Sequence, residues 1–399
     1  MEVYFSQEEG MKVPIKIWAT NLEAGALEQA KHLASLPFVH KHISLMADAH
    51  EGYGMPIGGV MATENVIIPN AVGVDIGCGM CAVKTTLTTE QMTADKLKKI
   101  LGRIREQVPV GFAHQKVPES AFNMPQTWQG EIVRYSVVGR EFENALTQLG
   151  TLGGGNHFIE IQKDADGAIW VMIHSGSRNI GLQVAKHYNE LAKGLNEKWC
   201  SSIPKKWDLA FLPLDSDEGE SYWKEMQYCV DFALANRKLM ICRISDIIAE
   251  EMDVHNEMLW DNPLINIAHN YAAKESHFGK NVVVHRKGAT LARADTIGII
   301  PGSQGTKSYI VRGKENADSF HSCSHGAGRK MGRKQAQRQL DLGEEQRKLD
   351  GQGILHSIRG TKDLDEASGA YKDISEVMKN QEDLVEILVE LSPIAVIKG

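Results

Sequence analysis

Short, polar, glycine-rich stretches recur from residue 48 to the end of this 399-residue chain, and they constrain its fold more than any other feature. They carry aspartate, cysteine and histidine between apolar runs, for example at residues 73–79 and 150–155. Glycine permits the tight turns that let such side chains converge on one point. The stretches are scattered without an internal repeat or a Pro/Ser-rich linker, so we expect one domain over residues 1–399. Its predicted class is α+β, with short strands, Gly-rich turns and surrounding helices.

The hydrophobic pattern predicts the individual elements. Helical spacing predicts helices at 22–36, 93–107, 131–149, 179–199, 221–252, 330–340 and 374–391. Short apolar runs predict strands at 158–161, 168–173, 264–267, 282–284, 297–300, 309–311 and 393–397. Residues 351–370 are predicted to form a loop.

Composition places the chain among globular proteins, because 42% of its residues are hydrophobic and 24% are charged. Six cysteines in 399 residues do not make a disulfide framework. No apolar run approaches the roughly 18 residues of a membrane-spanning helix, and the first residues lack the apolar core of a signal peptide. We therefore expect a cytoplasmic protein with free thiols and no membrane partner.

Asp75 and Cys78 stand three residues apart among glycines. A thiolate can bridge two metal ions, and a nearby carboxylate suits a hard divalent ion. A glycine-rich turn with a buried cysteine and a capping aspartate would produce the same pattern. Three histidines, His157, His174 and His269, each lie at the end of a predicted strand beside small residues. Their joint pattern favours an open metal site lined by imidazoles.

Two further pairs are ambiguous. Asp48 and His50 precede a glycine-rich turn and could support the site or contact the substrate, but an aspartate-stabilised turn fits equally well. Cys78 and Cys81 form a CxxC pair with no second CxxC in the chain, which argues against a structural zinc site.

A polar loop at 301–308 has the composition of a phosphate cradle. Backbone N–H groups beside its glycines and the side chains of Ser303, Thr306, Lys307 and Ser308 could act as donors. The two glycines are too close for a Walker A loop, and an ordinary polar turn is the alternative.

His325 lies between Ser324 and Gly326, where a ligand can approach closely. Arg329 and Arg333 follow at the predicted start of a basic helix, whose N-terminus attracts anions. A neutral imidazole can attack phosphorus and then transfer the group onward. A helix-capping loop is the alternative interpretation.

The ordered set of these motifs closely resembles the RtcB family of RNA ligases, and the resemblance covers nearly the whole chain. The motifs are GVDIGCGM at 73–80, LGGGNHFIE at 152–160, HSGSRNIG at 174–181, HNYAAKE at 269–275, IIPGSQGTKSYIVRG at 299–313, SHGAGR at 324–329, AYKDI at 370–374 and the terminal KG at 398–399.

Such ligases join RNA bearing a 3′-phosphate or 2′,3′-cyclic phosphate to RNA bearing a 5′-hydroxyl, in tRNA splicing or RNA repair. The resemblance implies GTP as co-substrate, two Mn²⁺ per subunit and RNA ends as partners, and we expect a monomer. His325 would carry GMP, Glu160 would read the guanine edge and Tyr371 would lie against the base. The implied metal ligands are Asp75, Cys78, His157, His174 and His269, with Cys78 as the bridge.

The resemblance also implies the remaining contacts. The implied GTP or GMP site consists of Asn156, His157, Phe158, Ile159, Glu160, His269, Asn270, Pro301, Gly302, Ser303, Gln304, Ser308, His325, Gly326, Ala327, Gly328, Tyr371 and Lys398. RNA or phosphate contacts are implied for Arg178, Arg329 and Arg333.

The chain departs from the family pattern in places. Gln304 stands where many relatives carry methionine, and Asn179 stands where glycine is frequent. The loop at 110–115 lacks the arginines and lysines of some bacterial relatives, which bears on the choice of RNA substrate.

Two other functions compete with ligation. A dinuclear metal phosphodiesterase or phosphatase would need the metal ligands but neither His325 nor Lys398. A non-catalytic GTP- or RNA-binding module would gain nothing from open metal positions.

The net charge of −7 argues only against indiscriminate coating of RNA. Residues 284–334, which hold His325, contain ten basic and three acidic residues, whereas residues 199–262 contain six basic and thirteen acidic ones. The acidic excess therefore belongs to a segment without motifs, and a local basic site remains compatible with the net charge.

Overall fold

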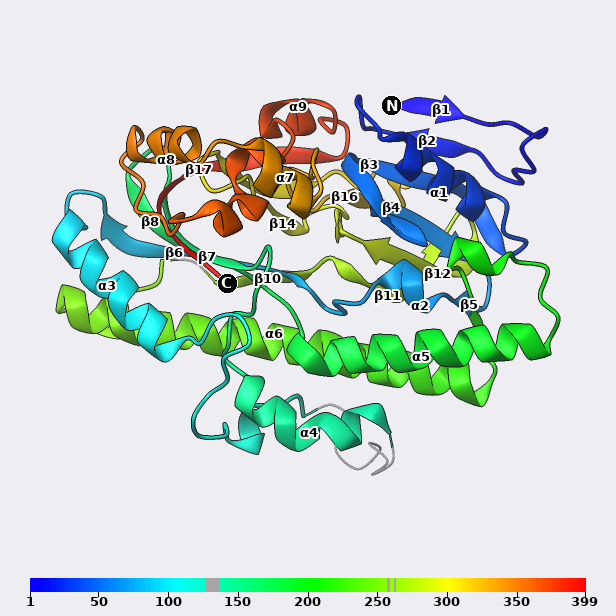
Figure 1. The fold of residues 1–399 in the computed structure, drawn as a ribbon, viewed down its shortest axis with the longest axis horizontal. Coiled ribbons are helices and arrows are strands. Elements are labelled where there is room, and N and C mark those ends of the chain that lie inside the picture. Colours follow the sequence, from blue (N-terminus) through cyan, green and yellow to red (C-terminus); the bar gives the residue numbers. More distant parts are fainter. Residues whose placement is uncertain (127–135, 257–258, 262) are drawn as a thin grey trace.

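Two large β-sheets and a layer of long helices make up the computed structural model, which describes all residues except 127–135, 257–258 and 262 (Figure 1). The predicted α+β class is confirmed. The six-stranded sheet has the order β1 (Glu2–Tyr4), β2 (Ile15–Ile17), β3 (Val39–Tyr53), β4 (Met55–Thr63), β12 (Lys280–Lys287) and β11 (Asn270–His277). The seven-stranded sheet has the order β10 (Ile265–Ala268), β6 (Gly79–Thr88), β8 (Ala168–Ser175), β7 (Phe158–Lys163), β17 (Val385–Lys398), β15 (Ser308–Gly313) and β14 (Ile297–Ile300). Two small sheets pair β13 (Ala289–Leu291) with β16 (Ser322–Ser324) and β5 (Val66–Ile67) with β9 (Leu212–Pro213).

The helices surround these sheets. They are α1 (Ala24–Ala34), α2 (Pro69–Val72), α3 (Ala94–Gln107), α4 (Val137–Gln148), α5 (Arg178–Lys198), α6 (Asp217–Met252), α7 (Arg333–Gln339), α8 (Leu342–Asp350) and α9 (Ile374–Lys379). Helices α3 and α6 contribute Ile104 and Ile244 to a core with Val83, Ile161 and Val171 of the seven-stranded sheet. Helix α5 runs beside α6 below the sheets (Figure 1).

Strand β7 separates the core from the site, because successive side chains on a strand point to opposite faces. Ile159 and Ile161 belong to the core that α3 and α6 complete. Phe158 and Glu160 point to the other face, where they line a cleft. One face of β7 therefore packs in the core, and its opposite face contributes Phe158 and Glu160 to the cleft.

Most of the predicted elements are present, but the predicted helix at 374–391 is wrong. Only Ile374–Lys379 is helical, and Val385–Lys398 forms strand β17 between β7 and β15. Pairing with two neighbouring strands outweighs the helix-like apolar spacing. The predicted loop at 351–370 contains 3-10 helices at Thr361–Glu366 and Ser368–Ala370.

Two other helices begin later than predicted. The helix predicted at 330–340 begins at Arg333, so Arg329 lies before it. Helix α4 accounts for 137–148 of the helix predicted at 131–149, and residues 131–135 lie outside the described part.

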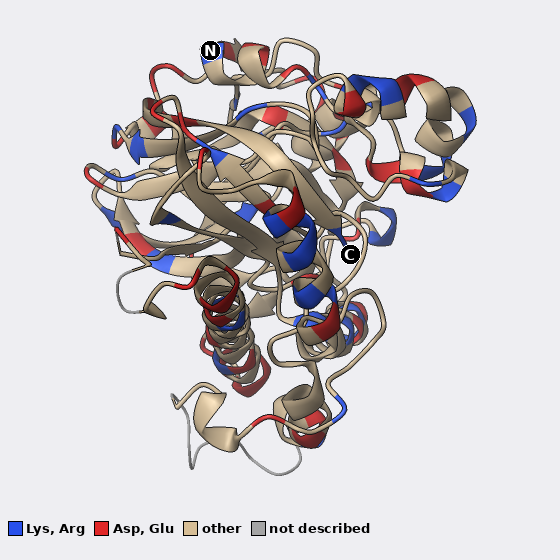
Figure 2. Ribbon diagram, turned by 90° about the vertical axis from the view of Figure 1, so that its left-hand side faces the viewer, with Lys and Arg blue, Asp and Glu red and all other residues tan. Residues whose placement is uncertain are grey.

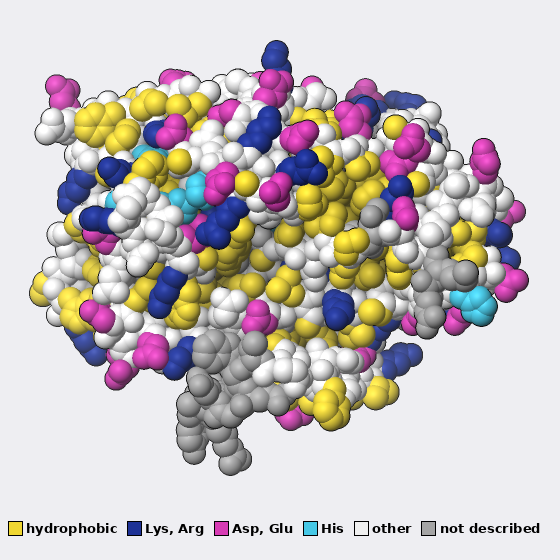
Figure 3. Space-filling model, turned by 180° about the vertical axis from the view of Figure 1, so that it is seen from behind, with side chains coloured by type: hydrophobic (Ala, Val, Ile, Leu, Met, Phe, Trp, Pro, Cys, Tyr) yellow, Lys and Arg dark blue, Asp and Glu magenta, His cyan; other side chains and the backbone are white. Residues whose placement is uncertain are grey.

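Charged residues lie mainly on outer helices and loops, and the central strands carry few of them (Figure 2). On the back of the molecule, apolar side chains gather around a hollow near the middle (Figure 3). Among the described residues, no helix has the length and apolar character needed to cross a lipid bilayer.

Candidate active site

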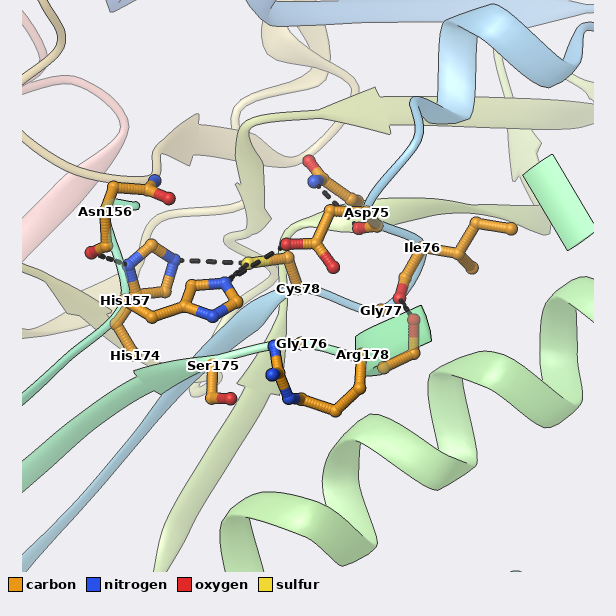
Figure 4. Close-up of polar contacts among 12 residues, drawn as sticks. Asp75, Ile76, Gly77, Cys78, Asn156, His157, His174, Ser175, Gly176 and Arg178 are labelled. Atoms are coloured by element: carbon orange, nitrogen blue, oxygen red, sulfur yellow. Dashed lines mark hydrogen bonds and ion pairs between the residues drawn. The ribbon is translucent and has the colours of Figure 1, made fainter. Parts of the chain in front are cut away.

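Five candidate metal ligands converge where strands of the seven-stranded sheet begin or end. The Cys78 Sγ lies 3.4 Å from Nε2 of His157 and 3.3 Å from Nε2 of His174 (Figure 4). On one side, His157 Nε2 lies 3.1 Å from an Asp75 carboxylate oxygen, and on the other, His174 Nε2 lies 3.4 Å from His269 Nε2. The five side chains thus form one continuous row with the thiol between the imidazoles.

Backbone carbonyls set the orientation of two imidazoles. His157 Nδ1 donates to the carbonyl of Leu152 at 2.9 Å, and His174 Nδ1 donates to the carbonyl of Asn156 at 3.1 Å. A carbonyl can only accept, so in each neutral ring the proton is on Nδ1 and Nε2 presents a lone pair. Both lone pairs face the Cys78 sulfur, a donor set that fits a divalent transition-metal ion.

The protonation states agree with this interpretation. Burial, together with neighbouring imidazoles, holds the pKa values of His174 and His269 well below the ordinary range, so both rings are neutral. Burial, reinforced by Asp75, raises the pKa of the Cys78 thiol well above its ordinary value. A cation in the cluster would displace that thiol proton, because metal ions bind the thiolate.

Close backbone approach requires glycine at two positions beside the cluster. Gly77 has φ +73°, and a Cβ there would lie 2.8 Å from the Cα of Val230 on α6. A Cβ on Gly176 would lie 2.3 Å from a carboxylate oxygen of Asp75. Any side chain at either position would move the metal-ligand loops apart.

Arg237 of α6 supports the same loops, and the sequence analysis did not identify it. Its Nη1 donates to the carbonyls of Gly77 at 3.0 Å and Ser175 at 2.8 Å, and its Nε donates to the Asn266 side chain at 2.8 Å. Arg237 is completely buried, and its Nη2 has no hydrogen-bond partner among the described residues. A polar Asn236–Arg237 pair within the mostly apolar stretch at 228–242 was the available sequence signal.

His325 lies beside the metal-ligand row, with its ring centroid 4.8 Å from that of His269. Its Nδ1 lies 2.6 Å from Oδ2 of Asp48, a fully buried residue of β3. The backbone N–H groups of His325 and Gly326 donate to the same oxygen at 3.1 and 3.3 Å. This arrangement keeps the proton on Nδ1 and leaves Nε2 of His325 with a lone pair that can attack an electrophile.

The open question about Asp48 and His50 is therefore answered by geometry. Burial alone would raise the pKa of Asp48, but His325, with His50 and Lys372, brings it below its ordinary value, so the carboxylate is charged. His50 donates through Nδ1 to the backbone carbonyl of Asp48 at 3.0 Å and lines the cleft. Burial lowers the pKa of His50 to about 4.

A cleft of about 820 Å³ opens in front of His325 and the cluster. The buried Glu160 lies on its wall and accepts a hydrogen bond from Gln162 at 2.6 Å. Burial raises the pKa of Glu160 to about 8 despite the nearby Lys398. The Lys398 ammonium lies 5.5 Å from the Phe158 ring centroid. The C-terminal strand therefore brings a cation to the carboxylate of β7.

The loop at 301–308 only partly forms the predicted cradle. Gly302 and Ser303 line the cleft, but the Thr306 hydroxyl accepts from the Ser303 N–H at 2.6 Å within the loop. Ser308 lies beneath the loop and accepts from the Gly302 N–H at 3.1 Å. Lys307 does not line the cleft and pairs instead with Glu390 on the half-exposed surface beside β15 and β17.

Glu366, which no motif in the sequence marked, organises two of the three predicted phosphate-binding arginines at the cleft. It pairs with Arg329 at 2.9 Å and Arg333 at 3.0 Å and accepts from the Tyr371 hydroxyl. Burial would raise the pKa of Glu366, but Lys398 and Arg329 hold it below its ordinary value. The side chain of Arg333 is 54% exposed, so it keeps the greater freedom to reach a ligand.

Most of the predicted nucleotide contacts line the cleft. These are Asn156, Phe158, Glu160, His269, Asn270, Pro301, Gly302, Ser303, Gln304, His325, Gly326, Ala327, Gly328, Tyr371 and Lys398. His157 lies in the metal-ligand row, Ile159 packs in the core and Ser308 lies beneath the loop, so these three do not line it.

Arg178 also lies outside the cleft wall. It donates to the Thr151 hydroxyl at 3.0 Å and to the Gly111 carbonyl at 2.9 Å. Its guanidinium packs against the Gly153 backbone near His157, where an added Cβ would meet Nη1 at 2.0 Å. The structure places Arg178 on the Asp75–His157 side of the cluster.

Comparison with known proteins agrees with these motifs. The family model described as tRNA-splicing ligase RtcB matches residues 29–399. The RNA-splicing ligase RtcB of Escherichia coli (strain K12) is 36% identical, and the match covers 97% of each chain. The tRNA-splicing ligases RtcB of Methanococcus maripaludis and Thermococcus kodakarensis are 33% and 31% identical, covering 99% and 98% of this chain and 96% of each relative.

Proposed function

The chain belongs to the RtcB family of RNA ligases, and on that premise we propose that it joins RNA 3′-phosphate or 2′,3′-cyclic phosphate ends to 5′-hydroxyl ends, with GTP as co-substrate. The observation that carries the proposal is the His325–Asp48 pair in a cleft beside the cysteine–histidine cluster. A binding module needs no oriented nucleophile, whereas nucleotidyl transfer does.

The proposed reaction has three displacements at phosphorus. His325 Nε2 attacks the α-phosphorus of GTP, so that a P–N bond forms and pyrophosphate leaves. An oxygen of the RNA 3′-phosphate then attacks the same phosphorus, the P–N bond breaks and GMP passes to the RNA end. Finally the 5′-hydroxyl attacks the RNA phosphate, loses its proton and displaces GMP. A cyclic phosphate would first be opened by water.

We propose that Asp75, Cys78 and His157 hold one Mn²⁺ and that Cys78, His174 and His269 hold the second. Divalent ions bound there would neutralise phosphate charge and orient the reacting phosphates. The row of short donor contacts supports this division, since Cys78 lies between the two histidines nearest to it.

The nucleotide contacts follow from the cleft. Glu160 is proposed to accept the guanine N–H donors, because it is a buried carboxylate with an unfilled requirement for donors. Tyr371 would lie against the guanine base, and Lys398 would approach both the base and Glu160. Arg333 is proposed as an RNA phosphate contact alongside Arg329 and Arg178.

Labelling with GTP that carries a radioactive α-phosphate tests the nucleophile. The purified protein with Mn²⁺ should form a covalent GMP adduct, His325→Ala should form none, and His356→Ala, a partly buried histidine that does not line the cleft, should label normally. Equal labelling of all three would refute the assignment. A phosphodiesterase or phosphatase, which the comparisons do not favour, would process 3′ ends without joined product and without need of His325.

We further propose that residues 1–399 act as one domain and as a monomer, in the cytoplasm. A panel of nicked RNAs with 3′-phosphate, cyclic phosphate or 3′-hydroxyl ends would define the accepted substrates.

A further inference from the structure

Tyr53 is a large aromatic residue that lines the cleft and yet is 79% exposed. Val74, which directly precedes the metal-ligand candidate Asp75, lines the same cleft and is 52% exposed. Within the described part of the chain, the Tyr53 ring packs against no other aromatic ring and its hydroxyl makes no hydrogen bond. An aromatic ring that is exposed inside a cleft is available to stack on a ligand.

The backbone that carries Tyr53 is firmly held. The Gly52 carbonyl accepts from Gln29 at 2.6 Å, and the Gly52 N–H donates back to Gln29 at 3.1 Å. The buried Lys287 ammonium donates to the Tyr53 carbonyl at 2.5 Å and to the Asn70 carbonyl at 2.9 Å. Tyr53 therefore projects from a fixed backbone, so that little backbone entropy is lost when a ligand binds its ring.

Lys287 also connects this turn to the proposed nucleophile. The next residue, Gly288, lies so close to His325 that a Cβ there would be 3.1 Å from the imidazole Cε1. One lysine side chain thus separates the Tyr53 backbone from the residue in contact with His325. Tyr53 and His325 line the same cleft, on backbone segments that Lys287 and Gly288 connect.

The local charges select which part of an RNA would lie there. Glu23 and Glu51 line the same cleft as Tyr53, and their carboxylates disfavour a phosphate nearby. A nucleobase is neutral and stacks on aromatic faces, which is how proteins commonly bind unpaired RNA. The basic side chains near His325, such as Arg333, are better placed for the phosphates.

We propose that Tyr53 forms a stacking shelf for a nucleobase of the RNA end held in the cleft, which Val74 also lines. The inference rests on the proposed ligase function and names a specificity contact within it. The base comes from either the 3′-phosphate strand or the 5′-hydroxyl strand, and the experiment distinguishes the two.

The test measures the KM for RNA in ligation and, separately, formation of the GMP adduct, which needs no RNA. Tyr53→Ala should raise the RNA KM about 5- to 10-fold, the lower end of the range for loss of one base–aromatic stack. Tyr53→Phe should stay within about twofold of the wild type, and Tyr53→Leu should resemble alanine. Adduct formation should be unchanged in all three. Phe122→Ala, which removes a 90% exposed ring outside the cleft, is the matched control.

RNAs with an abasic nucleotide at the terminal or penultimate position of one strand identify the stacked base. With the correct strand abasic, wild type and Tyr53→Ala should ligate equally. The inference is overturned if Tyr53→Ala ligates like wild type, if leucine restores activity as well as phenylalanine, or if the defect persists with either strand abasic. A wild type that forms no GMP adduct would instead refute the proposed function, and this inference with it.

Discussion

Replacing Asp48 by asparagine removes one charge behind His325 and changes almost no volume. The three donors that converge on Oδ2 determine how the amide would sit: His325 Nδ1 at 2.6 Å, the His325 N–H at 3.1 Å and the Gly326 N–H at 3.3 Å. The amide oxygen must take that position, because an NH₂ group there would face three donors. The amide nitrogen then replaces Oδ1, which has no hydrogen-bond partner among the described residues.

The geometry predicts a moderate loss in the rate of GMP-adduct formation for Asp48→Asn. The proton stays on Nδ1 of His325, so the nucleophilic nitrogen is preserved, but a charge-assisted hydrogen bond becomes a neutral one. That change is worth about 1–2 kcal/mol, which slows formation of the GMP adduct about 5- to 30-fold. Asp48→Ala leaves three donors without an acceptor and lets the His325 imidazole change its tautomer. We therefore expect the rate of GMP-adduct formation to fall roughly 10³- to 10⁴-fold.

Single-turnover labelling with α-phosphate-labelled GTP would measure both variants, and thermal unfolding would show that they remain folded. The difference in rate between the asparagine and alanine variants reports the orientation of the amide. If the labelling rate of Asp48→Asn is as low as that of Asp48→Ala, the amide has turned its NH₂ group toward Nδ1 of His325, and the inference that backbone donors fix the orientation of the amide is wrong. If neither variant is slowed, Asp48 does not orient the nucleophile.

Three further predictions concern the metal-ligand row and the cleft wall. Cys78→Ala should lose bound Mn²⁺ in elemental analysis, whereas Cys81→Ala, in the core behind it, should keep the metal and lose only about 1–2 kcal/mol of stability. Arg237→Met should destabilise the fold by about 2–4 kcal/mol in denaturant unfolding and weaken metal binding, because it leaves two loop carbonyls unpaired; unchanged metal affinity would contradict its positioning role. Burial raises the pKa of Glu160 from 4.5 to about 8, so the native state keeps a proton that the unfolded chain releases, and stability should fall as the pH rises from about 4.5 to 8. Glu160→Gln should flatten that slope in thermal unfolding, raise stability at pH 8 and weaken GTP binding; an unchanged slope would show that Glu160 is not the titrating group.

Local sequence determined most of the individual elements. Apolar spacing within one segment was enough to predict α3, α5 and α6 to within a few residues, because each helix satisfies its own backbone hydrogen bonds. It was not enough for β17, since residues 385–391 also carry apolar groups at helix-like spacing. The backbone of a strand is satisfied by its neighbours, and here those are β7 and β15, which lie far away in the sequence.

The site residues likewise divide into those that local sequence indicates and those that only the tertiary structure brings together. The residue types and their glycine-rich surroundings, by themselves, indicated Asp75, Cys78 and the three histidines, because metal ligation and glycine turns are properties of short segments. Tertiary structure alone decided which groups orient and support them. Asp48 reaches His325 across 277 positions, and Arg237 reaches Gly77 across 160. Such partners leave no local pattern, since a buried hydrogen bond depends on the spatial meeting of two groups and not on their spacing along the chain.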